Sequence, residues 1–306
     1  MNILITGGAG YVGTKLVKKL AQDNAVDQIV VYDNLIKENY NLFLVDKISN
    51  HEKINFIHGD ILDSKKLKKI LENIDIVYHL AAKVTSPFAN VNLHYYEQIN
   101  NWGTAELSYA IEDSNVKRVI YLSSMGVYGF SKEALTESSP TNPSSFYAIS
   151  KLKGERHIKA LSKKTEHIIL RCGNVYGYSR SMRFDAVINK FVFESNFNNK
   201  IIIQGSGEQH RAFIHIDAVS NSLSELTTKS IPSGTYNFSQ RNTSVLEIME
   251  ILKETNEELE FVFVNQQTKV NEQKVSDDQE LKKYIDYSPK RSLKEEIVAF
   301  QNSFSF

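Results

Sequence analysis

The chain of 306 residues has one cysteine, five prolines and no excess of charge of either sign. A single thiol, Cys172, excludes an internal disulfide framework and a zinc site built from cysteines. Lys plus Arg number 36 and Asp plus Glu also number 36, so the positive excess typical of nucleic-acid-binding proteins is absent. No apolar run approaches the roughly 20 residues of a membrane span, and the first residues do not resemble a signal peptide. We expect a folded cytoplasmic protein with neither nucleic acid nor a membrane as its partner, and we assign no metal ligands.

Apolar runs alternate with helical patterns as far as Arg171. Runs that are apolar without alternation are typical of parallel strands covered on both faces, and strand–helix alternation indicates a doubly wound α/β sheet. We predict strands at 2–6, 28–33, 54–58, 74–79, 117–122 and 166–171, and helices at 11–21, 64–71, 93–113 and 146–161.

A glycine-rich segment, Gly8-Ala9-Gly10-Tyr11-Val12-Gly13, joins the first strand to the first helix, and Gly7, Gly10 and Gly13 are spaced by three. So tight a turn requires residues without a Cβ, and the N-terminus of the following helix attracts phosphate. The simpler interpretation is an ordinary turn, but the strand before it and the helix after it favour a dinucleotide site. We include Tyr11 and Val12 in this site.

An acidic residue, Asp33, ends the second strand about 20 residues after the motif, where such residues bind the adenosine ribose. Its charge would repel the extra phosphate of NADP, so NAD is favoured, although Lys37 lies nearby. By itself Asp33 could also cap a loop. After the third strand, Asp60 is a weaker candidate for adenine binding, because Gly-Asp is also a common turn. We place Asn34 and Ile61 in the same cofactor site.

A Tyr-x-x-x-Lys sequence begins the helix that follows the fifth strand. Tyr147 and Lys151 lie one helical turn apart on one face, and Ser124 lies at the end of that strand, on the edge where doubly wound sheets bind ligands. A neighbouring ammonium and the cationic nicotinamide favour the phenolate of a tyrosine, whose ordinary pKa is near 10. Tyr147 would then be the base for a carbinol proton, and Ser124 would orient the substrate oxygen. The alternative is a surface helix beside a serine-rich loop, since Tyr11 and Lys15 share the same spacing.

Together these motifs resemble the NAD-dependent nucleotide-sugar epimerase/dehydratase branch of the extended short-chain dehydrogenase/reductase superfamily. The similarity covers nearly the whole chain. It rests on residues 6–13, 79–82, 123–129, 147–151, 170–177 and 205–215, and on Asn100, Gly103 and Thr104.

The resemblance implies a Rossmann domain at 1–172 that binds NAD, to which about residues 210–240 return, and a smaller C-terminal α/β substrate-binding domain at 173–306. It also implies a homodimer that packs helices 93–113 and 146–161, for which Trp102, Leu107, Ile111, Leu152 and Ile158 are candidates. Further implied ligands of the cofactor are Leu80, Ala81, Ala82 and Asn100. Asn174 and Arg211 are implied for the substrate diphosphate. Arg183, in a segment similar to enzymes of surface-polysaccharide sugars, faces either the diphosphate or solvent.

Two departures from the family pattern bear on the reaction. Dehydratases of the family carry an acidic pair after the catalytic hydroxyl, and the decarboxylating branch carries a glutamate there. This chain has Met125 and Gly126 at those positions, which disfavours 4,6-dehydration and decarboxylation. A late arginine of many relatives is also absent from residues 270–274.

These features favour an NAD-dependent nucleotide-sugar epimerase that acts at C4 of a hexose through a 4-keto intermediate. The alternative enzyme is a dehydrogenase or reductase that consumes or releases NADH stoichiometrically. A non-enzymatic alternative is an NAD-sensing regulator, which the complete set of Ser124, Tyr147 and Lys151 disfavours.

Overall fold

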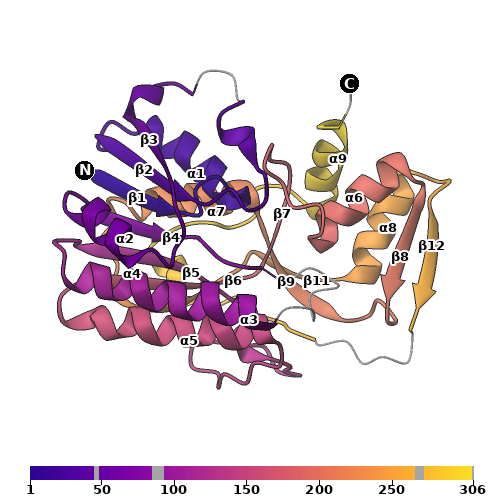
Figure 1. The fold of residues 1–306 in the computed structure, drawn as a ribbon. Coiled ribbons are helices and arrows are strands. Elements are labelled where there is room, and N and C mark those ends of the chain that lie inside the picture. Colours follow the sequence, from indigo (N-terminus) through magenta and orange to yellow (C-terminus); the bar gives the residue numbers. More distant parts are fainter. Residues whose placement is uncertain (45–47, 85–92, 266–271, 305–306) are drawn as a thin grey trace.

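The computed structural model describes residues 1–44, 48–84, 93–265 and 272–304. Its centre is a seven-stranded parallel sheet in the order β10-β6-β5-β4-β1-β2-β3 (Figure 1). The sheet confirms the predicted doubly wound α/β class. Its strands are β1 (Asn2–Thr6), β2 (Gln28–Asp33), β3 (Ile54–His58), β4 (Ile76–His79), β5 (Arg118–Ser124), β6 (Glu166–Cys172) and β10 (Gly234–Phe238).

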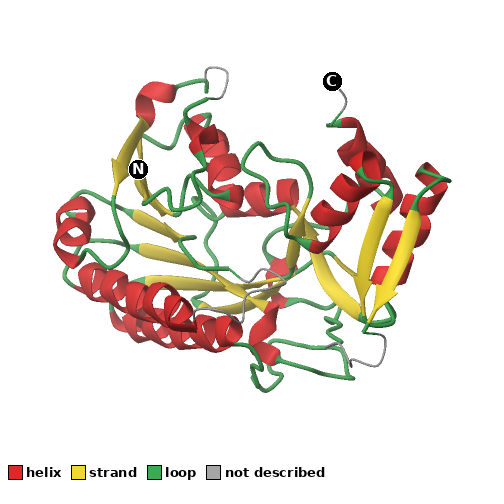
Figure 2. Cartoon of the chain, turned by 45° about the vertical axis from the view of Figure 1, so that its right-hand side comes forward, coloured by secondary structure: helices red, strands yellow, loops and turns green. Residues whose placement is uncertain are grey.

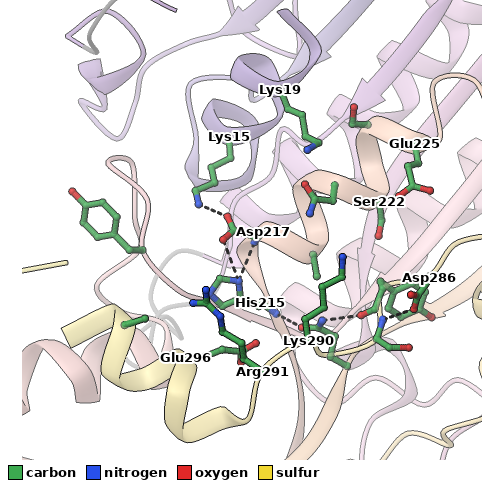
Figure 3. A pocket seen from close by; sticks show the side chains of 18 of the residues that line it. Lys15, Lys19, His215, Asp217, Ser222, Glu225, Asp286, Lys290, Arg291 and Glu296 are labelled. Carbon is green, nitrogen blue, oxygen red and sulfur yellow. Dashed lines mark hydrogen bonds and ion pairs between the residues drawn. The ribbon is translucent and has the colours of Figure 1, made fainter. Parts of the chain in front are cut away.

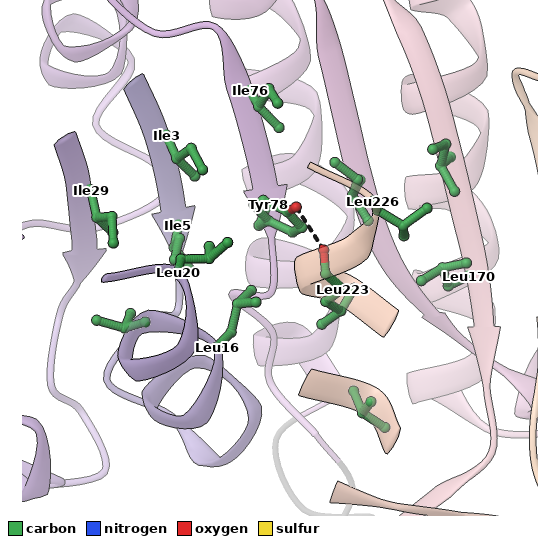
Figure 4. Close-up of a cluster of buried hydrophobic side chains, with 14 of the residues drawn as sticks. Ile3, Ile5, Leu16, Leu20, Ile29, Ile76, Tyr78, Leu170, Leu223 and Leu226 are labelled. Atoms are coloured by element: carbon green, nitrogen blue, oxygen red, sulfur yellow. Dashed lines mark hydrogen bonds between the residues drawn. The ribbon is translucent and has the colours of Figure 1, made fainter. Parts of the chain in front are cut away.

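Helices cover both faces of this sheet. One face carries α1 (Tyr11–Ala21) and α7 (Ile216–Glu225), and the other carries α2 (Ser64–Leu71), α4 (Gly103–Glu112) and α5 (Phe146–Ala160). Ile3 and Ile5 of β1 are buried with Leu16 of α1 and Leu223 of α7 (Figure 4), whereas Leu4 is buried with residues of α2, α4 and α5. Burial on both faces explains why the strands read as continuous apolar runs.

Several predicted bounds are confirmed: β1, β2, β3, α1 and α2 begin and end as expected. Strand β4 begins at Ile76, two residues later than predicted. The helix predicted at 93–113 is divided into α3 (Leu93–Tyr96), a π-helical segment (Glu97–Trp102) and α4. Such π-helical segments are rare and occur frequently at functional sites.

The C-terminal part of the chain forms a second, smaller α/β unit beside the main sheet (Figure 2). This unit has its own core of buried apolar residues, which includes Ile188, Phe213 and Ile248. The side chain of Tyr11 also enters this core, although Tyr11 belongs to α1. The unit consists of a three-stranded sheet, β7 (Asn174–Tyr176), β9 (His210–His215) and β11 (Arg241–Ser244), the pair β8 (Lys200–Gln204) and β12 (Glu260–Val264), and helices α6 (Val187–Phe197), α8 (Val245–Thr255) and α9 (Leu293–Asn302).

Short 3₁₀ helices connect these elements, at Tyr40–Leu42, His51–Lys53, Met125–Tyr128, Leu161–Lys163 and Glu280–Lys283. Serine side chains cap α5, α8 and α9 by accepting a backbone hydrogen bond, and Asp63 does the same for α2. Helix α1 has no side-chain cap. Across the described ranges, no helix is both long and apolar enough to cross a membrane.

Candidate active site

Glycines let the turn before α1 pack closely against the backbone around it. Gly7 has a φ of +72°, and a Cβ there would lie 2.6 Å from the backbone nitrogen of Ala81. A Cβ on Gly13 would lie 2.5 Å from the carbonyl oxygen of Gly7. Because no side chain caps α1, the N–H groups of its first turn remain available to an anion. The turn therefore fits the pyrophosphate of a dinucleotide.

The carboxylate of Asp33, at the end of β2, accepts hydrogen bonds from two backbone N–H groups. Ala9 N–H donates to it at 3.1 Å and Leu35 N–H at 2.9 Å. Each carboxylate oxygen keeps acceptor capacity for a ribose hydroxyl. The Asn34 amide donates to Asp60 at 3.1 Å, so the structure brings Asp33, Asn34 and Asp60 to one edge of the sheet. The negative charge there disfavours the additional phosphate that NADP carries on its adenosine ribose.

The segment after β4 packs directly against the glycine-rich turn. Thr6 accepts the backbone N–H of Leu80 with its carbonyl, at 3.0 Å, and that of Ala81 with its hydroxyl, at 3.3 Å. Ala82 follows in the same segment. Ile61 lies against Gly103 at the start of α4, where a Cβ would collide with the isoleucine side chain. Of these predicted cofactor residues, Leu80 and Ala81 therefore border the turn directly.

Asn100 joins two elements of the main unit. Its side-chain oxygen accepts the N–H of Lys83 at 2.8 Å, and its amide nitrogen donates to the Lys83 carbonyl at 2.9 Å and to Ser150 at 3.0 Å. Both amide hydrogens are thus used within the protein. Asn100 therefore fixes the segment after β4 to α5, and its contact with the cofactor stays a prediction.

The predicted catalytic trio lies on two neighbouring elements. Ser124 ends β5, where its Oγ accepts the N–H of Gly126 at 3.1 Å, and it lies close enough to the Tyr147 phenol to lower the pKa of that group. Tyr147 and Lys151 lie one turn apart in α5. The Lys151 side chain is buried, with its ammonium 4.1 Å from the centre of the Tyr121 ring. The other Tyr-x-x-x-Lys pair lies on α1, which covers the opposite face of the sheet from α5, and its Lys15 is paired with Asp217.

Burial shifts the ionisation of this trio. It raises the pKa of the Tyr147 phenol, and the nearby Arg183 charge and the Ser124 hydrogen bond lower it only in part. The same burial lowers the pKa of Lys151 to about 7, which Glu155 partly offsets. In the absence of ligands the phenol is therefore protonated at neutral pH. A phenolate has to be stabilised by cationic groups that bind with the ligands.

A buried ion pair behind the trio was missed by the sequence analysis. Glu155, on α5, accepts hydrogen bonds from Arg171 at 2.9 and 3.0 Å and from Ser123 at 2.7 Å. The Arg171 guanidinium also lies 4.6 Å from the centre of the Tyr128 ring. An arginine within the apolar run of β6, and a glutamate four residues after Lys151, were the available signals.

The predicted substrate residues lie in the smaller unit. Asn174 begins β7 and donates its amide to the carbonyl of Ala212 at 3.0 Å, which places it beside Arg211 on β9. Within the described part of the chain, the Arg211 guanidinium has no hydrogen-bond or ion-pair partner, and burial lowers its pKa. Arg183 forms a forked ion pair with Asp185, at 3.0 and 2.9 Å.

Residues 272–276 form a strap across the turn that follows Ser124. The side-chain amide of Gln273 donates to the carbonyls of Gly129 at 2.7 Å and of Met125 at 3.3 Å, and its backbone N–H donates to His210 on β9. The strap joins the Ser124 turn to the strand of Arg211. Within 272–274 no arginine is present; residues 270 and 271, from the same predicted stretch, lie outside the described residues.

A cleft of about 780 Å³ opens elsewhere, between α1, α7 and α9 (Figure 3). Its charges are of both signs, and among them Lys15 and His215 are paired with Asp217. None of the predicted site residues lines it. The cleft is therefore separate from the edge of the sheet where the trio lies.

Comparisons with known proteins agree with this geometry. Residues 3–238 match the NAD dependent epimerase/dehydratase family. A dTDP-D-glucose 4,6-dehydratase of Mus musculus is 34% identical over 84% of this chain and 75% of its own length. A putative UDP-glucose 4-epimerase of Methanocaldococcus jannaschii is 32% identical over 82% of this chain and 81% of its own.

Among solved structures, a UDP-glucuronic acid 4-epimerase of Bacillus cereus, in complex with UDP-glucuronic acid and NAD, superposes with a TM-score of 0.87. It is 27% identical, and the alignment covers 99% of this chain and 98% of that one. The chain belongs to the NAD dependent epimerase/dehydratase family, and it is an NAD-dependent enzyme that modifies nucleotide sugars.

Proposed function

We propose that the enzyme is a C4 epimerase of a nucleotide-diphosphate hexose. Tyr147 takes the proton of the C4 hydroxyl while Ser124 holds the same oxygen, and the C4–H bond breaks to leave a 4-keto sugar. Bound NAD supplies the acceptor that takes the C4 hydride and later returns it. The keto sugar turns over in the site, the hydride returns to its other face, and Tyr147 gives back the proton.

The two residues after Ser124 carry the choice of epimerisation over dehydration. Loss of water from the sugar requires an acid to protonate the departing hydroxyl. Met125 is 2% exposed and Gly126 has no side chain. Of the carboxylates on the elements around Tyr147, Glu155 is held by Arg171 and Asp185 by Arg183. Residues 85–92 and 266–271 contain no Asp or Glu in the sequence. The relatives are divided between dehydratases and epimerases, and the lack of an acid at positions 125 and 126 favours an epimerase.

Product analysis tests this proposal. Incubated with UDP-, GDP- and dTDP-hexoses, the enzyme should convert at least one into an isomer of the same mass, without net formation of NADH. The Tyr147→Phe variant should lose about 10²–10⁴ in kcat, the usual worth of a positioned base. A product lighter by one water would contradict the proposal and indicate a dehydratase. Stoichiometric NADH would support the net oxidoreductase.

The pH dependence of NAD binding tests the place of Lys151. The ammonium form attracts the anionic cofactor, and its pKa of about 7 in the cofactor-free enzyme means that the charge is lost as pH rises through that value. Affinity for NAD should therefore fall above about pH 7, by up to about tenfold per unit. Calorimetric titrations from about pH 6 to pH 9 measure this.

The chain offers a matched control in its second Tyr-x-x-x-Lys pair. Lys151→Met should weaken NAD binding and remove this pH dependence, whereas Lys15→Met should keep it, because Lys15 pairs with Asp217 away from the edge. A pH dependence that survives in Lys151→Met would show that another group titrates.

Arg211 has the features of a residue kept for binding. Within the described residues the Arg211 guanidinium has neither a hydrogen bond nor an ion pair, and a diphosphate is the ligand that satisfies its planar fork. We expect Arg211→Met to raise the KM for the nucleotide sugar about 10–100-fold, while resistance to urea stays the same or increases.

The matched control for Arg211 is Arg241 on the neighbouring strand β11, which is paired with Glu296 at 3.0 Å. Arg241→Met removes the cation from the Glu296 carboxylate, which keeps the hydrogen bond of the Tyr176 hydroxyl, and should lower the free energy of unfolding by about 1–3 kcal/mol. Equal destabilisation by both variants, or an unchanged KM in Arg211→Met, would remove Arg211 from the substrate site.

A homodimer through α4, α5 and the π-helical segment is the proposed assembly. Leu107, Ile111 and Ile158, expected as interface candidates, are fully buried in the core of their own subunit. Trp102, also an expected candidate, is 55% exposed, and the other exposed aromatic residues of this region are Tyr109, at 59%, Phe146, and Tyr95 on α3. Exposed aromatic side chains of this number are typical of an interface.

Size-exclusion chromatography with light scattering tests the assembly. The wild-type enzyme should have the mass of a dimer, and the double variant Trp102→Glu/Tyr109→Glu that of a monomer. Phe197→Glu, which changes an equally exposed aromatic residue on α6, should leave the dimer intact. A monomeric wild-type enzyme, or a double variant that remains dimeric, would contradict this interface.

A further inference from the structure

One buried amide, that of Asn189, joins three segments at the boundary between the two units. It lies in α6 and is 0% exposed. Its side-chain oxygen accepts the backbone N–H of Gly177 at 3.0 Å, and its nitrogen donates to the carbonyl of Arg183 at 3.0 Å and to the hydroxyl of Tyr11 at 3.3 Å. A buried polar group with all its hydrogen bonds made specifies one arrangement of the segments it joins.

Tyr11 brings the cofactor helix into this network. It is the first residue of α1, directly after the glycine-rich turn, yet its ring is buried in the core of the smaller unit. Its hydroxyl donates to the carbonyl of Gly177 at 2.5 Å and accepts from Asn189. The backbone of Tyr11 therefore faces the phosphate site, while its side chain fixes the start of the segment 177–189.

Two further contacts hold the same segment to helices beside the main sheet. The hydroxyls of Thr14, in α1, and Ser181 lie 3.0 Å apart, and the amide of Asn41 donates to the carbonyl of Arg180 at 2.7 Å. Thr14 and Asn41 each contact the segment at one residue. Asn189 hydrogen-bonds it at two, at Gly177 where it begins and at Arg183 in its middle. Substitution of Asn189 therefore releases Arg183 more directly than loss of either of the other two contacts.

Arg183 carries the charge that this arrangement positions. Its guanidinium is near enough to Tyr96 and Tyr147 to lower the pKa of both phenols, which places it at the catalytic edge. Tyr96 lies in turn 6.3 Å from Tyr147, measured between ring centres. The other groups that act on Tyr147 are Ser124 and Cys172.

We propose that Asn189 is a positioning residue that holds Arg183 at the nucleotide-sugar site, by fixing the backbone of the segment 177–185 to Tyr11 of the cofactor helix. The proposal rests on the proposed function, in that Arg183 faces the diphosphate of the substrate. Asn189 does not touch the substrate or the cofactor. It acts on substrate binding through Arg183, and it leaves the hydride step to Ser124, Tyr147 and Lys151.

The alternative is a buried asparagine that only stabilises the fold, and a double-mutant cycle separates the two. Asn189→Leu keeps the volume and removes the amide, so it should raise the KM for the nucleotide sugar about tenfold or more, with kcat changed less than about threefold. Added to Arg183→Gln, it should have no further effect on KM, because residues that act as one unit are not additive.

Binding of UDP and dTDP, measured by calorimetry for the same four proteins, gives a readout that does not need turnover. If no sugar is epimerised but the nucleotides bind and the cycle is non-additive, the proposed reaction fails and the role of Asn189 stands. If neither nucleotide binds the wild-type enzyme, both are overturned. Additive effects, or a loss confined to kcat, would overturn the role of Asn189.

Two more variants complete the experiment. Tyr11→Phe removes only the hydroxyl from the network and should raise KM to a smaller extent, again without effect in the Arg183→Gln background; it serves if Asn189→Leu does not fold. Asn196→Leu, on the same helix, removes a hydrogen bond to the carbonyl of Gln301 at the far end of α6. It should leave KM unchanged, and a KM raised as much as in Asn189→Leu would indicate a general loosening of α6.

Discussion

The close packing of α5 on β5 is the constraint on which the site depends. Gly154 permits it, because a Cβ at this position would collide with the hydroxyl of Tyr121. At this separation, Lys151 lies with its ammonium over the Tyr121 ring, and Glu155, one turn further, reaches Ser123 and Arg171. A larger residue at Gly154 would push α5 away from the sheet and move Tyr147 and Lys151 relative to Ser124.

The buried charges of the protein divide into two kinds. Those of Arg171 and Arg241 are neutralised by a carboxylate within hydrogen-bond distance, as the cost of burying an ion requires. Lys151 and Arg211 have no carboxylate partner within the described residues, and burial lowers the pKa of both. Cations without partners, beside a glycine-rich turn with free N–H groups, are matched to ligands that bring negative charge. This matches an enzyme that binds a dinucleotide and a nucleotide sugar together, although the formal charge of the chain is zero.

Much of the fold was predictable from the sequence, and so was the placement of Ser124, Tyr147 and Lys151 on neighbouring elements, because the signals are local. Continuous apolar runs define buried parallel strands, and the ends of these strands place Asp33 and Ser124 on one edge. The direction of a side chain within a folded core is not local. Tyr11 belongs to the cofactor turn by position, yet its ring packs in the other unit, and no sequence signal indicates the hydrogen bonds that join Asn100 to Lys83 and Ser150. Leu107 was expected at a dimer interface, but it is fully buried in the core of its own subunit.

Epimerisation at C4 and dehydration differ in what happens at the neighbouring carbons. In C4 epimerisation the same hydrogen leaves and returns to C4, and no C–H bond elsewhere is broken. Dehydration removes the C5 hydrogen as a proton and takes one back from solvent. The reaction is therefore run in deuterium oxide and the product is examined by NMR. This is the most direct test of the claim that Met125 and Gly126 favour epimerisation over dehydration. The account predicts a C4 epimer with no deuterium bound to carbon. Deuterium at C5 would contradict it.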